Sequence, residues 1–200
     1  MKKILLVAVM AIMSLVSEAQ NTMREIGTFT LQPKIGLSSG YLSGTWAAEP
    51  KEKRKLVAGI VIGAEGEYYA AKWLGVAAGV NYAMQGWKFN YEDRSEITRL
   101  NYLNIPLTAN FYVLKGLALK TGVQFGFLLN AKERVHDVDT DIKDNCKKFC
   151  FSIPVGLSYE FSNIVIDARY NFAATRVIDN AVDKKRSDLI QLTVGYKFAL

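Results

Sequence analysis

The chain has 200 residues, half of them hydrophobic and 22% charged, with a formal net charge of +6 at pH 7. This length suits one domain with a sizeable core. So mild an excess of basic residues permits contact with acidic surfaces but does not require nucleic acid, and we expect no nucleic acid partner. After residue 19 no apolar run is long enough for a transmembrane helix, which needs about 20 residues, so hydropathy alone would class the chain as soluble.

The chain begins with the pattern of a secretory signal peptide. Two lysines precede an apolar run at 4–16, and the residues at 17–19 fit a small-x-small cleavage site. The apolar run is shorter than the roughly 20 residues of a spanning helix. We therefore expect residues 1–19 to be a signal peptide and residues 20–200 to form the exported domain.

Beyond the signal peptide, apolar residues recur with a period of two, which indicates β-strands rather than helices. Most of these segments have about 10 to 14 residues, longer than the five or six usual in soluble sheets. A tilted strand needs about 9 to 11 residues to cross a bilayer. The eight predicted strands are 28–38, 57–70, 73–86, 100–113, 117–130, 149–161, 163–173 and 189–199.

One face of each predicted strand is apolar and carries no charge, whereas the other face is mostly Gly, Ala, Ser, Asn, Gln and Thr, with ions of both signs. On a soluble barrel the second face would meet bulk water and should be rich in charged residues. Small residues with balanced charge describe a confined interior instead, where buried charges must be paired. We expect the apolar face to contact lipid and the polar face to hold an ion network of Lys34, Glu65, Glu67, Lys120, Glu160, Asp167, Arg169 and Lys197.

The connections alternate in length. Because consecutive antiparallel strands place alternate connections at opposite ends, all the long ones should lie at one end, as in outer-membrane barrels with short periplasmic turns and longer external loops. The tight turns are at 71–72, 114–116 and Ser162, and the predicted long loops are 39–56, 87–99, 131–148 and 174–188.

Aromatic residues gather near both ends of the strands, which is typical of the two interfaces of a bilayer. Those near the short turns are Tyr68, Tyr69, Trp73, Tyr112, Tyr159, Phe161, Tyr196 and Phe198. Those near the long loops are Trp87, Phe89, Phe127, Phe149, Phe151 and Phe172.

The final strand ends in GYKFAL, with Tyr196, Phe198 and Leu200 on one face. The machinery that inserts outer-membrane barrels reads an amphipathic aromatic strand of this kind, so we expect that machinery as a partner. A terminal strand also suits closure, because pairing it with the first strand removes the sheet edge.

The stretch YLNIPLTANFYVLKGLALKTGVQFGFLLNAK, followed by IDARYNF and VGYKF, resembles the PorT-type outer-membrane β-barrel domain. The resemblance covers essentially the whole mature chain. It implies a porin-like eight-stranded barrel in the outer membrane of a Gram-negative bacterium, with both termini in the periplasm. It brings no shared catalytic residue. A few relatives serve protein secretion, but no residue in this sequence selects that role.

Together these observations predict an all-β protein, an eight-stranded antiparallel up-and-down transmembrane β-barrel. A barrel of eight strands has an interior just filled by side chains. We therefore expect a plugged polar lumen rather than a diffusion pore, with a structural or surface-binding role carried by the long external loops.

Two loops carry residues with possible chemistry. In the first, the basic run Lys51, Lys53, Arg54 and Lys55 suits phosphates of lipopolysaccharide, although a plain solvated loop has the same composition. In the third, HDVDTDIKDN contains His136, the single histidine of the sequence. A His–Asp pair can activate a hydroxyl and alternating Asp can bind calcium. No nucleophile is convincingly placed, and the Gly and Glu of a calcium loop are missing, so we expect no enzyme, metal or cofactor.

Cys146 and Cys150 are the two cysteines of the chain. An oxidising exported location favours a disulfide between them, with free thiols as the alternative.

A different class of function stays open at this point. A soluble exported barrel in the manner of lipocalins would turn the Leu and Phe face inward around an apolar ligand. An envelope enzyme acting through the third loop is a third reading, and a role in outer-membrane protein secretion a fourth.

Overall fold

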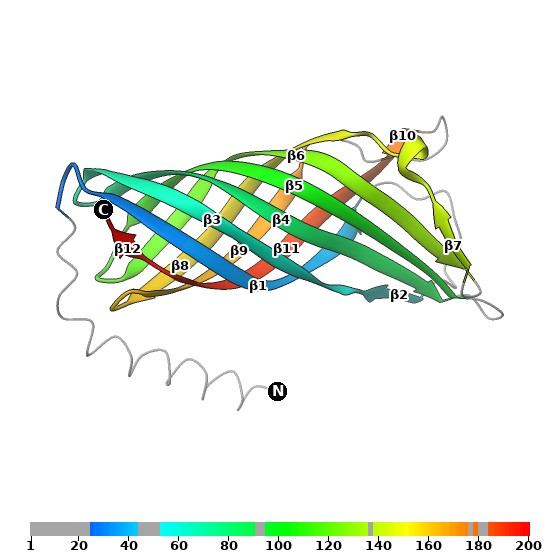
Figure 1. Ribbon diagram of the computed structural model, residues 1–200, viewed down its shortest axis with the longest axis horizontal. Coiled ribbons are helices and arrows are strands. Elements are labelled where there is room, and N and C mark those ends of the chain that lie inside the picture. Colours follow the sequence, from blue (N-terminus) through cyan, green and yellow to red (C-terminus); the bar gives the residue numbers. More distant parts are fainter. Residues whose placement is uncertain (1–24, 44–52, 91–94, 136–137, 176–177, 180–183) are drawn as a thin grey trace, which may run out of the picture.

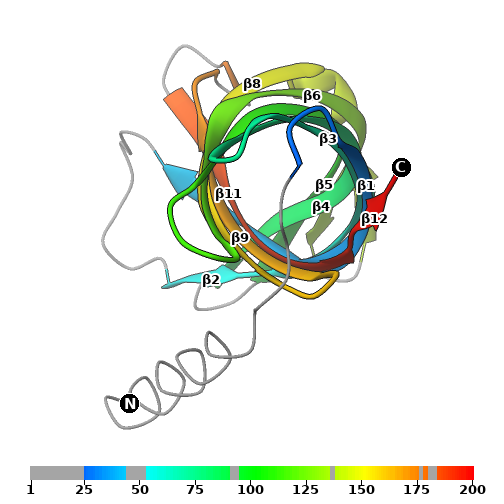
Figure 2. The ribbon, with the colours of Figure 1, turned by 90° about the vertical axis from the view of Figure 1, so that its left-hand side faces the viewer.

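The computed structural model describes residues 25–43, 53–90, 95–135, 138–175, 178–179 and 184–200. The predicted signal peptide lies outside these residues. Within them, long antiparallel strands wind into a closed barrel (Figures 1 and 2). In the part of the chain that the structure describes, no helix is both long and apolar enough to cross a membrane.

Eight strands form the wall of the barrel, and shorter strands extend it. The wall strands are β1 (Phe29–Ser43), β3 (Ala58–Ala71), β4 (Leu74–Asn90), β5 (Ser95–Tyr112), β6 (Leu117–Val135), β8 (Phe149–Phe161), β9 (Ile164–Ala173) and β11 (Lys184–Tyr196). The shorter elements are β2 (Lys53–Leu56), β7 (Val138–Asp141), the 3-10 turn η1 (Lys143–Asn145), β10 (Ile178–Asp179) and β12 (Phe198–Ala199).

The first and last wall strands close the sheet. β1 pairs antiparallel with β11 from Lys34 opposite Gly195 to Ser43 opposite Arg186. β12 continues this seam, with Thr30 opposite Ala199. Every other wall strand pairs with its neighbour in the chain. The sheet therefore has no free edge through the barrel, and the prediction of an eight-stranded up-and-down barrel is confirmed.

The tight turns lie together at one end, which we call the short-turn end. Gly116 has φ +79°, and a Cβ there would lie 2.5 Å from the carbonyl oxygen of Glu160, so this turn requires glycine. The last residue reaches the same end, where the N–H of Leu200 donates to the carbonyl oxygen of Phe29 at 2.9 Å. We call the opposite end the long-loop end.

At the long-loop end, the strands run further than the sequence indicated. β5 and β6 have 18 and 19 residues, and β2, β7 and β10 pair with wall strands there. Much of the predicted loops 39–56, 87–99, 131–148 and 174–188 is therefore strand. Beyond the lipid-facing part of the wall, the outward side chains need not be apolar. The alternation of apolar and polar residues therefore disappears from the sequence, although the backbone hydrogen bonds between the strands continue.

The apolar face of the wall points outward. Val76, Leu157 and Leu192 are each about half exposed, with exposed fractions of 51–52%, while the alternate residues of the same strands are buried. This is the reverse of a soluble barrel. The lipocalin-like alternative is therefore wrong, because it needs the Leu and Phe face inside.

A charge on this apolar outer face should destabilise the inserted barrel. Leu107 lies opposite Ala78 and Val123, and its outward side chain is 43% exposed. Because a lipid-facing arginine near the bilayer centre costs about 2–4 kcal/mol, we expect Leu107→Arg to lower the free energy of unfolding in lipid by that amount. The measurement is urea unfolding in vesicles, followed by gel mobility of unheated samples. Leu114→Arg, in a tight turn with 65% exposure, is the control and should unfold like wild type; equal stability of the two variants would contradict the outward belt.

Candidate functional site

All eight ions that the sequence placed in the interior are buried, none more than 6% exposed. They alternate along their strands with the exposed apolar residues of the belt. In a closed barrel, the buried set faces the interior. The structure sorts them into two clusters.

The larger cluster centres on Arg169 of β9. Its guanidinium donates two hydrogen bonds to the carboxylate of Glu65 on β3, both at 2.7 Å, and its Nε donates to Asp167 at 2.8 Å. Glu65 also pairs with Lys34 of β1, and Asp167 with Lys120 of β6 at 2.6 Å. Because β9 and β3 are separated in the wall by β11 and β1, this cluster crosses the interior.

The second cluster centres on Lys197, between β11 and β12. Its ammonium donates to Glu67 of β3 at 2.9 Å and to Glu160 of β8 at 3.0 Å. It also donates to the hydroxyls of Tyr69 and Tyr112, at 3.0 and 3.3 Å. The N–H of Lys197 binds the carbonyl oxygen of Asn163 in a tight turn at 2.7 Å, so this cluster lies toward the short-turn end.

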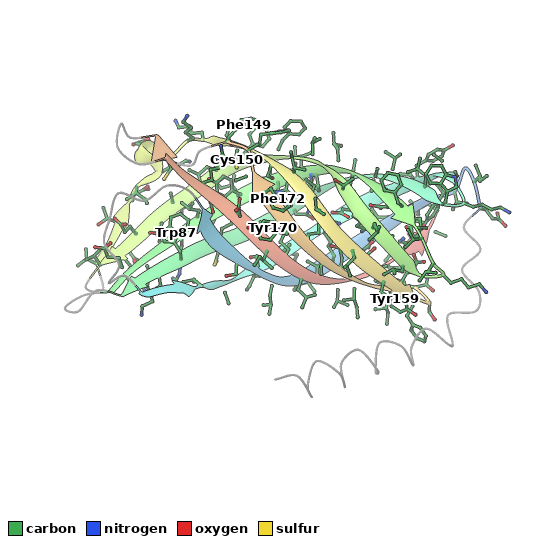
Figure 3. The ribbon with its side chains drawn as sticks, turned by 180° about the vertical axis from the view of Figure 1, so that it is seen from behind. Trp87, Phe149, Cys150, Tyr159, Tyr170 and Phe172 are labelled. Carbon is green, nitrogen blue, oxygen red and sulfur yellow. The ribbon has the colours of Figure 1, made fainter. Side chains whose placement is uncertain are left out.

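Tyr69 and Tyr112 were expected at the membrane interface with the other aromatic residues near the short turns, but their side chains point into the barrel. The Tyr112 hydroxyl donates to Glu67 at 2.7 Å, and Tyr69 is buried. Strand alternation explains this, since Tyr68 points outward and its neighbour Tyr69 must then point inward. Phe149, Tyr159 and Phe172, in contrast, stand on the outside of the wall (Figure 3).

The charges of the two clusters balance. The first holds three cations and two anions, and the second one cation and two anions, which makes four of each sign. Each charge has at least one partner of opposite sign within 3.0 Å. Removing water from an ion is costly unless it is paired and hydrogen-bonded, and this arrangement meets both conditions.

An apolar cluster lies inside the barrel at the long-loop end, and the sequence reasoning missed it. Tyr102 and Leu100 of β5 are almost fully buried there. A β-bulge leaves Leu129 of β6 without a partner in β5, so that both Leu128 and Ala131 face inward. The full cluster is Trp87, Leu100, Tyr102, Leu128, Ala131 and Cys146. Trp87 was expected on the outer belt, and its burial here corrects that prediction.

A small cavity lies beneath this apolar cluster. It has a volume of about 10 Å³ and is lined by Tyr102, Asn104, Gln124 and Asn171, among others. That is at most the room of one water molecule.

The two cysteines are free thiols in the structure, so the predicted disulfide is not formed there. Cys146 follows η1 and is buried in the apolar cluster, while Cys150 lies in β8 and packs against the same cluster from a partly buried position. Burial raises the pKa of the Cys146 thiol, which keeps it protonated and slow to react.

The basic run of the first predicted loop is only partly described. Lys51 lies outside the described residues. Lys53, Arg54 and Lys55 belong to β2, whose backbone pairs with β4 and sets Lys55 opposite Lys88.

The acidic run of the third loop is also partly described. His136 and Asp137 lie outside the described residues. Asp139 accepts two hydrogen bonds from Arg134 at 2.6 and 2.9 Å, and Asp141 accepts one from the N–H of Lys143 at 2.8 Å. Among the described residues, no three His, Cys, Asp or Glu side chains gather as a metal site.

Comparison with solved structures gave matches to small outer-membrane barrels. Neisserial surface protein A (NspA) matches with a TM-score of 0.50 and 17% identity, over 85% of this chain and 97% of that chain. Ail, the attachment invasion locus protein of Yersinia pestis, matches with a TM-score of 0.48 and 16% identity, over 87% of this chain and all of that chain. At such identities the likeness to NspA supports the fold alone. Among curated proteins, none matches the chain.

The family assignment comes from the sequence profile of the outer membrane protein beta-barrel domain, which matches residues 18–179. That is most of the chain. Proteins of this family are located in the outer membrane of Gram-negative bacteria, in agreement with the apolar residues on the outer face of the wall. The chain belongs to the family of outer membrane protein beta-barrel domains.

Proposed function

We propose that the protein is a closed, non-enzymatic barrel whose long-loop end faces the exterior and makes contacts at the cell surface. The observation that carries this proposal is the Arg169 cluster. It ties β1, β3, β6 and β9 together across the interior. A path for solutes would have to break these ion pairs.

Two further layers support a closed interior. On the short-turn side, the Lys197 cluster and its two tyrosines occupy the barrel. On the other side, the cluster around Leu100 and Tyr102 occupies the interior mainly with apolar side-chain atoms, which cannot replace the water around a hydrated ion. The three layers together favour a plugged lumen with a structural role for its ions.

The orientation follows from the asymmetry of the connections. Outer-membrane barrels have short periplasmic turns and longer external loops, so the short-turn end, with Phe29 and Leu200 beside it, belongs in the periplasm. Lys53, Arg54 and Lys55, which belong to β2 at the long-loop end, then lie on the exterior side. Their positive charge suits the phosphates of lipopolysaccharide.

The last strands support recognition by the insertion machinery. Tyr196 and Phe198 are exposed on the outside of the wall, with ring centroids 4.7 Å apart. We propose that this outward aromatic pair is read by an insertion complex during folding. We also propose the PorT type within the broader family, on the sequence elements quoted above; a part in protein secretion is the second function consistent with that type.

A plugged barrel should not conduct. Purified protein reconstituted into planar bilayers is expected to show no stable channel, because the Arg169 cluster crosses the interior and the apolar cluster excludes hydrated ions. Single-channel recording is the measurement, with an open porin in the same bilayers as the positive control. Stable openings that disappear when the protein is omitted would contradict a closed interior.

Breaking the Arg169 cluster should strongly destabilise the barrel. Arg169→Gln leaves Glu65 and Asp167 buried with fewer partners, and removing one side of a buried ion pair costs about 3–5 kcal/mol. We expect this loss in the free energy of unfolding, measured by urea titration with unheated gel mobility.

Arg134→Gln is the matched control, because its pair with Asp139 is about 40% exposed and such pairs contribute at most about 1 kcal/mol. If the two variants were equally stable, the interior cluster would have no structural role.

A further inference from the structure

The strand register arranges the outward side chains of β4, β5 and β6 in rows that cross all three strands. One row, Tyr82, Leu103 and Phe127, is still apolar. The next row toward the long-loop end is Met84, Asn101 and Asn130, and the one after it is Gly86, Arg99 and Lys132. The outer wall thus changes from lipid-facing rings to amides and then to cations within a few residues.

Arg99 and Lys132 lie directly opposite each other on neighbouring strands. Like charges in such a pair destabilise a sheet. Both side chains are exposed. The fold therefore places two cations side by side and gains nothing from their mutual interaction.

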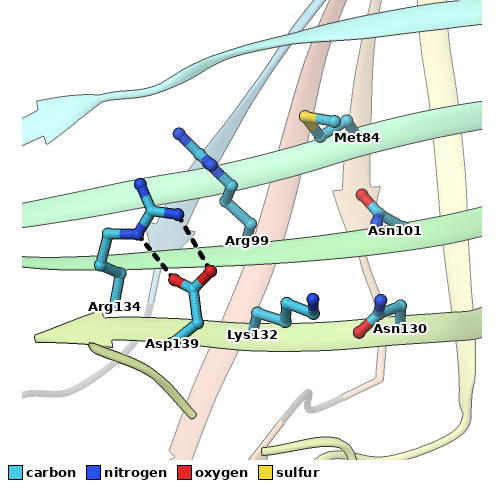
Figure 4. Close-up of a pocket in the computed structure, with 7 residues that line it drawn as sticks. All are labelled: Met84, Arg99, Asn101, Asn130, Lys132, Arg134 and Asp139. Atoms are coloured by element: carbon cyan, nitrogen blue, oxygen red, sulfur yellow. Dashed lines mark hydrogen bonds and ion pairs between the residues drawn. The ribbon is translucent and has the colours of Figure 1, made fainter. Parts of the chain in front are cut away.

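The acidic residues nearby are already engaged. Both oxygens of Asp139 accept hydrogen bonds from Arg134, as Figure 4 shows. The hydrogen bond from Arg134 lowers the pKa of Asp139, and the charges of Lys132 and Arg99 add to this. Asp141 lies opposite Lys132 in the pairing of β6 with β7, and it accepts a hydrogen bond from the N–H of Lys143. Within the described residues, no carboxylate forms an ion pair with Arg99 or Lys132.

The same surface is hollowed into a pocket of about 230 Å³, lined by Met84, Arg99, Asn101, Asn130, Lys132, Arg134 and Asp139. Asn101 carries a buried side-chain oxygen that has no hydrogen-bond partner among the described residues. Three cations, Arg99, Lys132 and Arg134, face the two carboxylates of Asp139 and Asp141 at this surface, and the excess positive charge suits a phosphate. The amides of Asn101 and Asn130 line the same pocket and suit the hydroxyl groups of a sugar.

We propose that Arg99, Lys132 and Asn101 bind the phosphorylated sugar headgroup of a glycolipid in the leaflet around the long-loop end. The phosphate contacts the two cations, and the sugar hydroxyls form hydrogen bonds with the amides of Asn101 and Asn130 that line the pocket. The row of Leu103 and Phe127 lies immediately beside the pocket, where the acyl chains of the same molecule would run. This adjacency favours a lipid over a free phosphate. The assignment of that leaflet to the exterior rests on the orientation proposed above, whereas the binding site itself does not.

The test is calorimetric titration of the folded, detergent-solubilised protein with three probes: lipid A, dephosphorylated lipid A and inorganic phosphate. We expect wild type to bind lipid A and to bind the other two at least tenfold more weakly. Arg99→Gln with Lys132→Gln should weaken lipid A binding by about tenfold per cation removed. Lys115→Gln, which removes one exposed charge at the short-turn end, should bind like wild type.

A single substitution separates binding from folding. Lys132→Gln removes both the repulsion from Arg99 and the attraction to Asp141 on the opposite side, so it should leave the unfolding temperature without lipid close to that of wild type while weakening lipid A binding about tenfold. Three results would overturn the proposal: equal binding of dephosphorylated lipid A, preference for inorganic phosphate, or undiminished binding by the double variant. Because the titration is done in micelles, these failures are distinct from a failure of the closed interior or of the orientation.

Discussion

The pairing of β1 with β11 is the constraint on which the rest of the structure depends. In a bilayer, no water satisfies the N–H and C=O groups of a free edge, so the sheet must close. Closure divides every strand into an inner and an outer face, because successive side chains point to opposite sides. The outer face then has to be apolar. The inner face receives everything else, including charges.

Those interior charges are stable only because closure brings distant segments together. Glu65 and Arg169 are 104 residues apart in the chain. They meet because the barrel is narrow enough for side chains to reach across its interior. With four ions of each sign inside, the cluster geometry meets the requirement that buried charge be paired. The closed interior proposed here would leave the ends and the outer wall as the surfaces available for function.

At the long-loop end, the same strands run from the lipid-facing part of the wall into a region of charged residues. Along β5 and β6 the backbone ladder is continuous, but the outward residues pass from Leu103 and Phe127 to Arg99 and Lys132. The bulge at Leu129 changes which residues of β6 face inward, and it lets the apolar cluster form inside at the same level. A rigid wall with a charged rim results, in which the positions of the cations are fixed by strand register rather than by flexible loops.

The sequence alone determined the fold class, the central part of each wall strand and the identity of the eight interior ions. These follow from alternation with a period of two, which is a local property and survives without knowledge of the partners. The tertiary structure decided which ion meets which. It also decided that Tyr69, Tyr112 and Trp87 turn inward, that Cys146 is buried as a free thiol, and that the strands continue past the apolar belt. It set Arg99 opposite Lys132. These features depend on the register between strands, and register is fixed by closure of the whole barrel rather than by any single segment.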